Sequence, residues 1–264
     1  ETVALIDRCL DYNLKVYRAP LLSDIEENKN ITSQIEKIQI EDILERDPIK
    51  LDNKLVAKEI FNKCVFVTGG AGSIGSEIVR QVASYRPRKL IIIDQAESPL
   101  YQIQLEIRNS FPNLSFEAII NDIRDYHKTE IVFKNNNPDV VFHAAAYKHV
   151  PLMESFPAEA IFANVQGSKN IADLALKYNA EKFVMVSTDK AVNPSNVMGA
   201  SKRIAEIYVQ ALQEYSNKDL KKTTSFVTTR FGNVLGSNGS VVPLFKRQIE
   251  EGGPLTITHP DIIR

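Results

Sequence analysis

From residue 63 onward, apolar runs of strand length alternate with amphipathic runs of helix length. This alternation is typical of a parallel sheet covered by helices on both faces, and it constrains the fold more than any other feature. The candidate strands read CVFVTG, KLIIID, SFEAIIND, DVVFHAAA, KFVMVST, SFVTTRFG and PLTIT, and the candidate helices span residues 73–85, 99–111, 158–178, 197–215 and 243–251. The sequence therefore predicts an α/β fold with a doubly wound parallel sheet.

The helix over residues 99–111 has signals at its start as well as along its length. Ser98 has the side-chain oxygen of a helix N-cap, and Pro99 suits the first turn. Apolar side chains recur at helical spacing, at Leu100, Ile103, Ile107 and Phe111. We therefore expect this helix to begin directly after Ser98.

The first sixty residues differ in character from the rest. The stretch TVALIDRCLDYNLKVYRAP predicts one helix and one strand, a polar stretch follows, and a short helix is expected over residues 54–61. We interpret residues 1–45 as the tail of a preceding domain plus a linker, and residues 46–264 as the main domain. The alternative is an N-terminal extension of that same domain. Since the chain begins without Met and ends just after an apparent strand, we expect it to be a piece of a longer protein.

The composition excludes several classes of protein. Lys and Arg number 32 against 33 Asp and Glu, so no basic field favours nucleic acid or an anionic membrane surface. Cys9 and Cys64 form no CxxC pair, which suits a reducing compartment and argues against a structural zinc site or a disulfide scaffold. No apolar run approaches the roughly twenty residues that span a bilayer. We expect a soluble, cytosolic chain.

A glycine-rich turn lies between the first main-domain strand and its helix. VTGGAGSIGSE places Gly69, Gly72 and Gly75 at GxxGxxG spacing, where glycine permits a sharp turn and close approach of a pyrophosphate. The helix that begins near Ser73 and Ile74 would direct its N–H groups at the phosphates. This pattern predicts a Rossmann-like dinucleotide site, and the alternative is a merely tight turn.

Polar residues end the next two strands. Asp94, followed by Gln95, stands where a carboxylate can accept hydrogen bonds from the adenosine ribose. An Asp there would repel a 2′-phosphate and no Arg follows it, so NAD is favoured over NADP; the alternative for Asp94 is a turn or helix cap. Asp122 and Ile123 close the third strand, where Asp122 could meet the adenine amino group.

The fourth strand ends in small residues. Ala144, Ala145 and Ala146 follow His143 and would let a flat cofactor lie across the strand ends. Small residues at a strand end are also common in plain packing.

Several long motifs in order resemble a known family. TGGAGSIG (68–75), HAAAYKHVPLME (143–154), STDKAVNPSNVMGASKR (187–203), RFGNVLGSNGSVVPLF (230–245) and THPDI (258–262) are similar to the extended short-chain dehydrogenase/reductases that act on nucleotide sugars. More closely, the chain resembles the bacterial UDP-N-acetylglucosamine 4,6-dehydratases of the polysaccharide biosynthesis group, from about Asp42 to its last residue.

The resemblance implies an organisation for the whole protein. Large members carry a membrane bundle, a nucleotide-binding-like domain and then the catalytic domain, and residues 1–45 resemble the end of that middle domain. Residues 46–264 would then be the NAD-binding catalytic domain, with its small C-terminal substrate lobe largely missing. The parent protein would be anchored at the cytoplasmic face of the bacterial inner membrane, and would form a homo-oligomer through the helices around Lys202 and Ala158.

Ordinary short-chain dehydrogenases use a YxxxK pair, in which the Tyr moves the substrate proton. Here Met198 stands four residues before Lys202, and a thioether has no proton to move. The fifth strand, however, ends in Thr188, Asp189 and Lys190, where such folds place their chemistry. The sequence therefore indicates that the acid–base work is reassigned to these three residues.

The resemblance implies a reaction without net redox change. Hydride leaves C4 of the sugar for NAD, the ketone acidifies the C5 proton, water is lost across C5 and C6, and the hydride returns to C6. We assign Lys190 as the C5 base, a protonated Asp189 as the C6 acid and Thr188 as the partner of the C4 oxygen. Lys202 would hold the nicotinamide ribose and receive the C4 hydroxyl proton through water. The alternatives are a solvated charge for Lys190 and a turn cap for Asp189.

Within the family, Met in place of Tyr resembles the branch that retains configuration at C5; a core-packing Met198 does not conflict with this. Lys148 and His149 are the expected contacts on the sugar side and Asn233 on the diphosphate side, with UDP-N-acetylglucosamine as substrate. His143 and His149 lack a second ligand at metal spacing, so we propose no metal. Two alternative functions are a nucleotide-sugar 4-epimerase and a catalytically silent NAD- or nucleotide-sugar-binding module.

Overall fold

The computed structural model describes residues 17–18, 36–37, 53–218, 224–232, 234 and 241–256. Contacts divide the chain into two units, Glu1–Leu51 and Asp52–Arg264. In the first unit, β1 (Tyr17–Arg18) pairs antiparallel with β2 (Glu36–Lys37). The identity of residues 1–45 as the tail of another domain remains a prediction.

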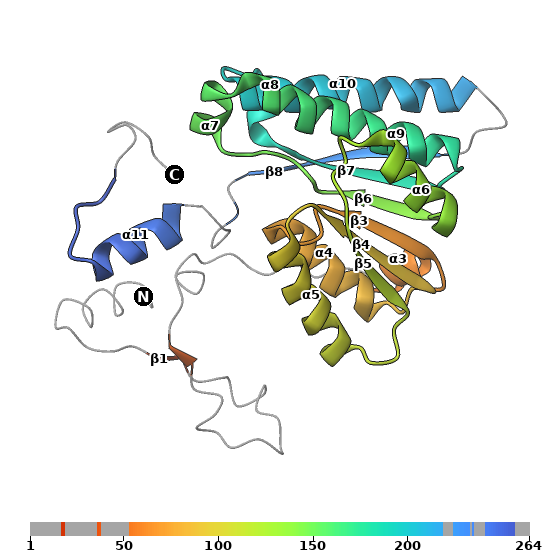
Figure 1. The fold of residues 1–264 in the computed structure, drawn as a ribbon, viewed down its shortest axis with the longest axis horizontal. Helices are drawn as coiled ribbons and strands as arrows, with labels where there is room; N and C mark the ends of the chain where they lie inside the picture. Colours follow the sequence, from red (N-terminus) through yellow and green to blue (C-terminus); the bar gives the residue numbers. More distant parts are fainter. Residues whose placement is uncertain are drawn as a thin grey trace, which may run out of the picture. The chain divides into compact units, whose positions relative to one another are not determined.

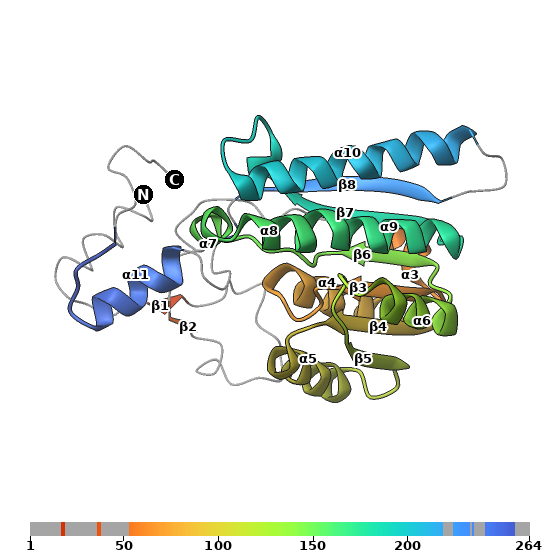
Figure 2. The same ribbon diagram turned by 45° about the horizontal axis from the view of Figure 1, so that its top comes forward.

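Six strands of the second unit form one parallel sheet in the order β5-β4-β3-β6-β7-β8. They are β3 (Cys64–Thr68), β4 (Lys89–Asp94), β5 (Phe116–Ile120), β6 (Val140–His143), β7 (Lys182–Thr188) and β8 (Ser225–Phe231). Helices lie on both faces of the sheet (Figures 1 and 2). The predicted Rossmann-like, doubly wound fold is confirmed.

The helices follow the strands in the order that a doubly wound fold requires. They are α3 (Asn53–Ile60), α4 (Ser73–Ser84), α5 (Glu97–Ser110), α6 (Tyr126–Asn136), α7 (Val150–Ser155), α8 (Pro157–Ala160), the π-helix η3 (Ile161–Gly167), α9 (Ser168–Lys177), the 3₁₀ turn η4 (Asp189–Ala191), α10 (Val197–Lys218) and α11 (Val241–Glu250). None of the described helices is both long and apolar enough to cross a bilayer.

The core has two layers, one on each face of the sheet. On one face, Val65 and Val67 of β3 pack with buried side chains of α3, α4 and α5. On the other, Phe66 of the same strand packs with side chains of α6, α9 and α10. Because both faces are covered, a central strand must be apolar at every position, and this explains the unbroken apolar runs in the sequence.

Several predicted boundaries were wrong. The helix predicted over residues 99–111 begins at Glu97 with Ala96 at its N-cap, and Ser98 lies inside the helix, where its hydroxyl donates to Glu97. The segment PLTIT was predicted as a strand, but its described residues 254–256 have no regular structure. The predicted helix over residues 158–178 is α8, η3 and α9 in succession. None of the predicted helices corresponds to α6 or α7.

The chain order of the strands creates a crevice at one edge of the sheet. From β3 the chain winds outward through β4 to β5, and then returns to the other side of β3 as β6. At such a switch point the loops after the two central strands diverge, which leaves room for a ligand at the carboxyl ends. The fold therefore places the glycine-rich turn after β3 beside the alanines after β6.

Candidate active site

A cavity of about 300 Å³ occupies this switch point. Nine of the predicted cofactor residues line it, namely Gly69, Gly72, Asp94, Gln95, Asp122, Ile123, Ala144, Ala145 and Ala146. Ser73, Ile74, Gly75 and Lys202 are not among the lining residues. Sequence reasoning missed other wall residues, of which Asn121, Arg124 and Tyr147 carry polar groups. The residues from four strand ends thus converge on one cavity.

The glycines of the turn are required by close backbone packing. Gly69 has a φ of +68°, and a Cβ built there would lie 2.5 Å from the backbone nitrogen of Ala145. A Cβ at Gly75 would lie 1.9 Å from the carbonyl oxygen of Gly69. The turn is therefore tight, as the alternative interpretation holds, and in addition it forms a wall of the cavity.

Asp94 is a cap as well as a wall of the cavity. Its carboxylate accepts hydrogen bonds from the backbone N–H of Ala71, 3.0 Å away, and from that of Ala96, 2.9 Å away. The capping alternative is therefore confirmed. Each carboxylate oxygen can still accept a further hydrogen bond, so the predicted contact with a ribose hydroxyl remains compatible with this geometry.

Both carboxylate oxygens of Asp122 accept hydrogen bonds from the side chain of Arg124. The Arg124 guanidinium donates to both Asp122 oxygens at 2.6–3.0 Å, and also to Glu159 of α8 at 2.7 Å. Burial raises the pKa of Asp122, but these hydrogen bonds outweigh it and hold the pKa below its usual value. Arg124 is a cation in the cavity wall, yet two carboxylates share its charge.

His143 is a structural residue. It is fully buried, with Nδ1 2.7 Å from Thr68 Oγ1 and Nε2 2.9 Å from Ser168 Oγ. Burial, with a smaller contribution from the charge of Lys202, lowers the pKa of His143 to about 3. The imidazole is neutral at physiological pH. Within the described residues, no three His, Cys, Asp or Glu side chains gather as a metal site.

The depressed pKa of His143 predicts a loss of stability in mild acid. Between pH 6.5 and about 3 the unfolded chain binds this proton and the folded chain does not, so stability falls as pH falls through that window. From pH 7 to pH 5 we expect a loss of about 2 kcal/mol from this group, measurable by urea unfolding. His143→Gln should flatten this pH dependence, whereas the exposed His127→Gln should leave it unchanged; an equal slope in both variants would refute the assignment.

Thr188, Asp189 and Lys190 lie together at the end of β7. Asp189 Oδ1 accepts hydrogen bonds from Thr188 Oγ1 at 2.9 Å and from Lys190 Nζ at 3.1 Å. Burial raises the pKa of Asp189, but the hydrogen bonds from Lys190 and Thr188 outweigh it, and the pKa is lowered. Without substrate, Asp189 is therefore an ionised carboxylate paired with Lys190. In this form Asp189 has no proton to donate.

Lys202 lies deep in the protein behind these residues. Its side chain is buried, and Nζ donates to the carbonyl oxygen of Val186 on β7 at 2.8 Å. Burial lowers the pKa of Lys202 to about 8, against an opposing effect of Glu206. This hydrogen bond, two residues before the end of β7, ties α10 to the strand that leads directly into η4, where the predicted acid and base lie.

Met198 packs in a small apolar cluster. It is 3% exposed and contacts a group that includes Met153 and Ala160, with Tyr147 and Val150 at its edge. The core-packing interpretation is therefore confirmed. One residue further along α10, a Cβ at Gly199 would lie 2.3 Å from the carbonyl oxygen of Lys190, so the start of α10 packs directly against η4.

Asn164 is a site residue that sequence reasoning missed. It is fully buried in η3; its Oδ1 accepts from Tyr147 N at 2.8 Å, and its Nδ2 donates to Tyr147 O and to Ser201 Oγ, both at 3.0 Å. The segment after β6 is thereby tied to α10 next to Lys202. A π-helix often marks a functional site, but the periodicity of the sequence does not reveal it.

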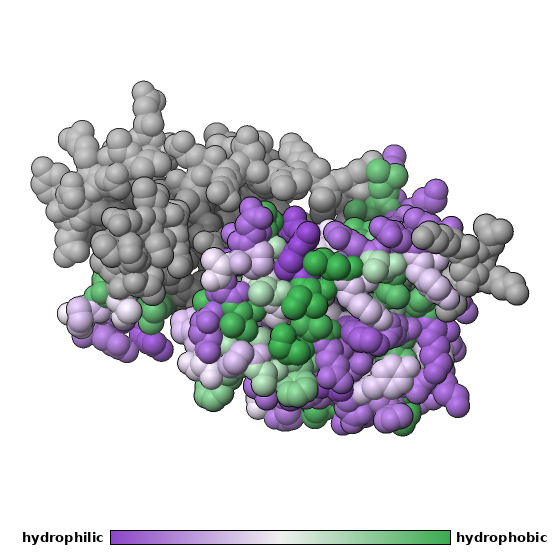
Figure 3. All heavy atoms as spheres, turned by 90° about the horizontal axis from the view of Figure 1, so that it is seen from above, coloured by the Kyte–Doolittle hydropathy of each residue, from purple (hydrophilic) through white to green (hydrophobic). Residues whose placement is uncertain are grey.

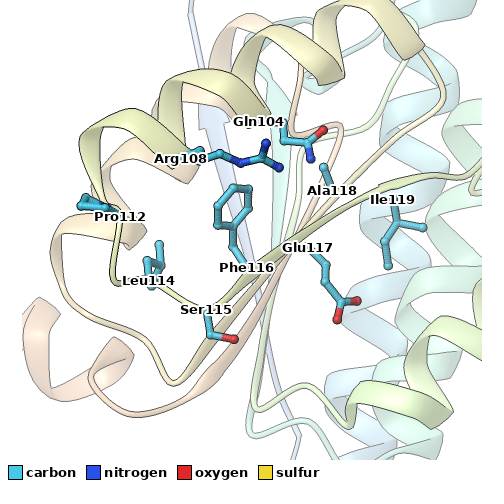
Figure 4. A pocket seen from close by; sticks show the side chains of 9 residues that line it. All are labelled: Gln104, Arg108, Pro112, Leu114, Ser115, Phe116, Glu117, Ala118 and Ile119. Carbon is cyan, nitrogen blue, oxygen red and sulfur yellow. The ribbon is translucent and has the colours of Figure 1, made fainter.

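The predicted substrate residues Lys148 and His149 do not line the dinucleotide cavity. Lys148 and His149 are exposed in the segment between β6 and α7. Asn233 lies outside the described residues. A second hollow, of about 530 Å³, lies between the end of α5 and β5, where Arg108 extends over Phe116 and Gln104 extends toward Ala118 (Figure 4). None of the predicted site residues lines it.

Comparison with known proteins places the chain in a family. A family model described as polysaccharide biosynthesis protein matches residues 65–264. The chain belongs to this family. The predicted resemblance to the polysaccharide biosynthesis group is therefore confirmed.

Curated relatives include both dehydratases and epimerases. The capsular polysaccharide biosynthesis protein CapD of Staphylococcus aureus is 47% identical over 97% of the chain and 42% of CapD. A UDP-N-acetylglucosamine 4,6-dehydratase (inverting) of Campylobacter jejuni is 38% identical over 76% of the chain and 59% of that protein. A UDP-glucose 4-epimerase of Rickettsia canadensis is 39% identical over 77% of the chain and 58% of that protein. The chain spans less than half of CapD.

Solved structures share the fold. Pen from Bacillus thuringiensis is 36% identical with a TM-score of 0.70, over 76% of the chain and 61% of that structure. WbmH from Bordetella bronchiseptica, in complex with NAD⁺, is 26% identical with a TM-score of 0.58, over 72% of the chain and 63% of that structure.

Proposed function

We propose that this chain is the catalytic core of a nucleotide-sugar 4,6-dehydratase that converts UDP-N-acetylglucosamine into its 4-keto-6-deoxy product. The observation that carries the proposal is the contact of a lysine, a carboxylate and a hydroxyl at the end of β7, Lys190, Asp189 and Thr188. A 4-epimerase needs no C5 base and no C6 acid. The similarity to the C. jejuni dehydratase and to CapD supports a role in bacterial surface polysaccharide synthesis.

The cavity fits a dinucleotide. Gly69 leaves the space that a Cβ would fill, and Asn121 Oδ1, buried at the wall, has no hydrogen-bond partner among the described residues and suits a donor such as the adenine amino group. NAD, when bound, accepts hydride from C4 and returns it to C6. We propose NAD rather than NADP, because Asp94 would repel a 2′-phosphate and Arg124 is already paired with two carboxylates. The NAD⁺ complex of WbmH agrees with this choice.

One proton transfer within the ion pair of Lys190 and Asp189 would produce both the base and the acid that the reaction needs. Transfer of one proton from Lys190 Nζ to Asp189 across 3.1 Å leaves a neutral amine and a protonated carboxyl. When the sugar covers the pair and excludes water, these neutral forms are favoured. Lys190 then takes the C5 proton, and Asp189 protonates the departing C6 hydroxyl as water. Lys190 returns a proton to C5 as hydride reaches C6.

The C4 hydroxyl proton closes the cycle. Thr188 Oγ1 is hydrogen-bonded to Asp189 and can hold the C4 oxygen, whose proton leaves through water to solvent, or to Lys202 when that residue is neutral. Lys190, which gave its own proton to Asp189 and returns the C5 proton to the sugar, regains a proton from solvent. Lys202 would hold the nicotinamide ribose. Lys148 and His149 would contact the sugar, and Asn233 the diphosphate. Over one turnover the sugar loses one water and the protein is restored.

Met198 takes no part in these transfers. Because a buried thioether replaces the usual Tyr, we propose that the chain belongs to the branch that retains configuration at C5. The C. jejuni relative is an inverting enzyme, and it is similar over only part of its length.

The whole protein is proposed to act as a membrane-anchored homo-oligomer at the cytoplasmic face. Exposed apolar side chains on η3 and α10, Ile161, Phe162, Ile204 and Ile207, give a surface for pairing two copies. Apolar side chains gather on the face shown in Figure 3.

The mass of the product tests the function. The protein with NAD bound should convert UDP-N-acetylglucosamine into a product lighter by one water, without accumulating reduced cofactor. A 4-epimerase, the function of the Rickettsia relative, would change the sugar without changing its mass. An unchanged sugar with NAD bound would indicate the silent binding module.

A further inference from the structure

Glu206 is a buried carboxylate on the same face of α10 as Lys202. The two residues are four apart in the helix, so their side chains point in the same direction one turn apart. Glu206 is 0% exposed and Lys202 is 3% exposed. A buried carboxylate is retained only when it is paired or hydrogen-bonded, and the predicted chemistry gives no role to Glu206.

The partners of Glu206 come from the neighbouring strand and from its own helix. Arg230 of β8 donates through Nε to Oε1 at 2.9 Å and through Nη2 to Oε2 at 2.7 Å. Arg203 of α10 donates to Oε2 at 3.1 Å. Burial raises the pKa of Glu206, but the interactions with Arg230, Ser187 and Arg203 outweigh it and lower the pKa to about 2. Glu206 is therefore a permanent anion at neutral pH.

Lys202 and Glu206 together hold α10 against two adjacent strands. Lys202 Nζ binds the carbonyl of Val186 on β7, whereas Glu206 binds the side chain of Arg230 on β8. In the sheet, Arg230 is the register partner of Ser187, the residue that follows Val186. The two contacts thus hold the strand ends at neighbouring positions, two residues before Thr188 on β7 and one residue before Phe231 on β8.

We propose that Glu206 is a positioning residue, which keeps the buried Lys202 ammonium charged and fixes the ends of β7 and β8 beside it. The negative charge of Glu206, one helical turn from Lys202, offsets the cost of burying the Lys202 ammonium group. The positive charges of Arg230 and Arg203, which are bound to Glu206, reduce this stabilisation. The link from Lys202 to catalysis rests on the proposed function, but the electrostatic coupling does not.

Other charged or titratable groups around Lys202 do not account for this effect. His143 on β6 is neutral and uncharged near pH 8, because its pKa is about 3. Asp189 and Lys190 of η4 are partly exposed and paired with each other. Among the residues that the structure describes, Arg203 and Arg230 are also charged, and both are bound to Glu206 itself.

The coupling predicts that the pKa of Lys202 shifts in opposite directions in the variants Glu206→Gln and Arg230→Gln. In protein labelled with ¹³C at the lysine Cε, the Lys202 signal can be assigned by its loss in Lys202→Met and titrated by NMR. Glu206→Gln should lower the pKa of Lys202 by about one unit or more, since the amide keeps the shape but removes the charge. Arg230→Gln, which removes a cation, should raise it. Glu214→Gln, an exposed carboxylate further along α10, should leave it unchanged.

A purely structural role would give a different pattern. If Glu206→Gln and Arg230→Gln shift the pKa of Lys202 in the same direction, or not at all, the inference is overturned. If Glu206→Gln does not fold, Arg203→Gln provides the second test, because Arg203 is 39% exposed and its loss should also raise the pKa of Lys202. Opposite shifts in a protein that does not dehydrate the sugar would support the inference and count against the proposed function instead.

Discussion

Replacing Gly75 with alanine is expected to abolish NAD binding and to destabilise the domain by roughly 3 kcal/mol. The new Cβ would lie 1.9 Å from the carbonyl oxygen of Gly69 and 2.7 Å from its carbonyl carbon. Both are backbone atoms that cannot rotate away, so the turn after β3 must open. Opening the turn displaces Gly69, which lines the cavity. Isothermal titration with NAD and urea unfolding would measure the two effects.

Two other glycines give graded controls for this substitution. A Cβ at Gly72 would lie 3.3 Å from Gly69 O, so Gly72→Ala should cost less stability and weaken NAD binding less. A Cβ at Gly232 would meet none of the described residues within 4 Å, and Gly232→Ala should bind NAD as the wild type does. If Gly75→Ala bound NAD normally, the glycine-rich turn could not be the phosphate site proposed here.

Replacing Lys190 with methionine is expected to lower dehydration of UDP-N-acetylglucosamine by about 10²–10⁴-fold, because methionine cannot take the C5 proton. NAD binding should stay within about twofold of wild type, since Lys190 does not line the dinucleotide cavity. Single-turnover assays would separate the steps, because hydride transfer from C4 does not require the C5 base. Reduced cofactor should therefore form and persist in the variant.

Lys134→Met is the matched control, because Lys134 is exposed near the end of α6, away from β7. It should leave the rate unchanged. Full dehydratase activity in Lys190→Met would remove Lys190 as the base and favour its interpretation as a solvated charge.

The sequence predicted the sheet better than the helices. The central strands are buried on both faces, so their apolar runs are unambiguous. By contrast, α6 has only Thr129, Val132 and Phe133 buried, which is too short an apolar pattern to stand out from a loop. The start of α5 was misplaced because Ser98, a good N-cap by type, is used inside the first turn while Ala96 occupies the cap position. Tertiary packing, not local preference, decided both cases.

In the candidate site, too, residues in local sequence motifs were predicted and residues that depend on distant contacts were not. Residues in motifs, such as Gly69, Asp94 and Ala145, were predicted to face a cofactor, and they line one cavity. Arg124 and Asn164 were missed because their importance depends on partners far away in sequence, Glu159 for one and Tyr147 and Ser201 for the other. Such contacts follow from the crossover connections of the sheet and carry no local pattern.

The most direct test of the central claim is NMR of UDP-N-acetylglucosamine incubated in deuterated water with the protein. We expect a 6-deoxy-4-keto sugar with deuterium at C5, because Lys190 exchanges the abstracted proton with solvent before returning one to C5. Retained configuration at C5 would support the interpretation of Met198. A sugar that keeps its C6 hydroxyl and its C5 proton, while NAD is demonstrably bound, would contradict the dehydratase assignment.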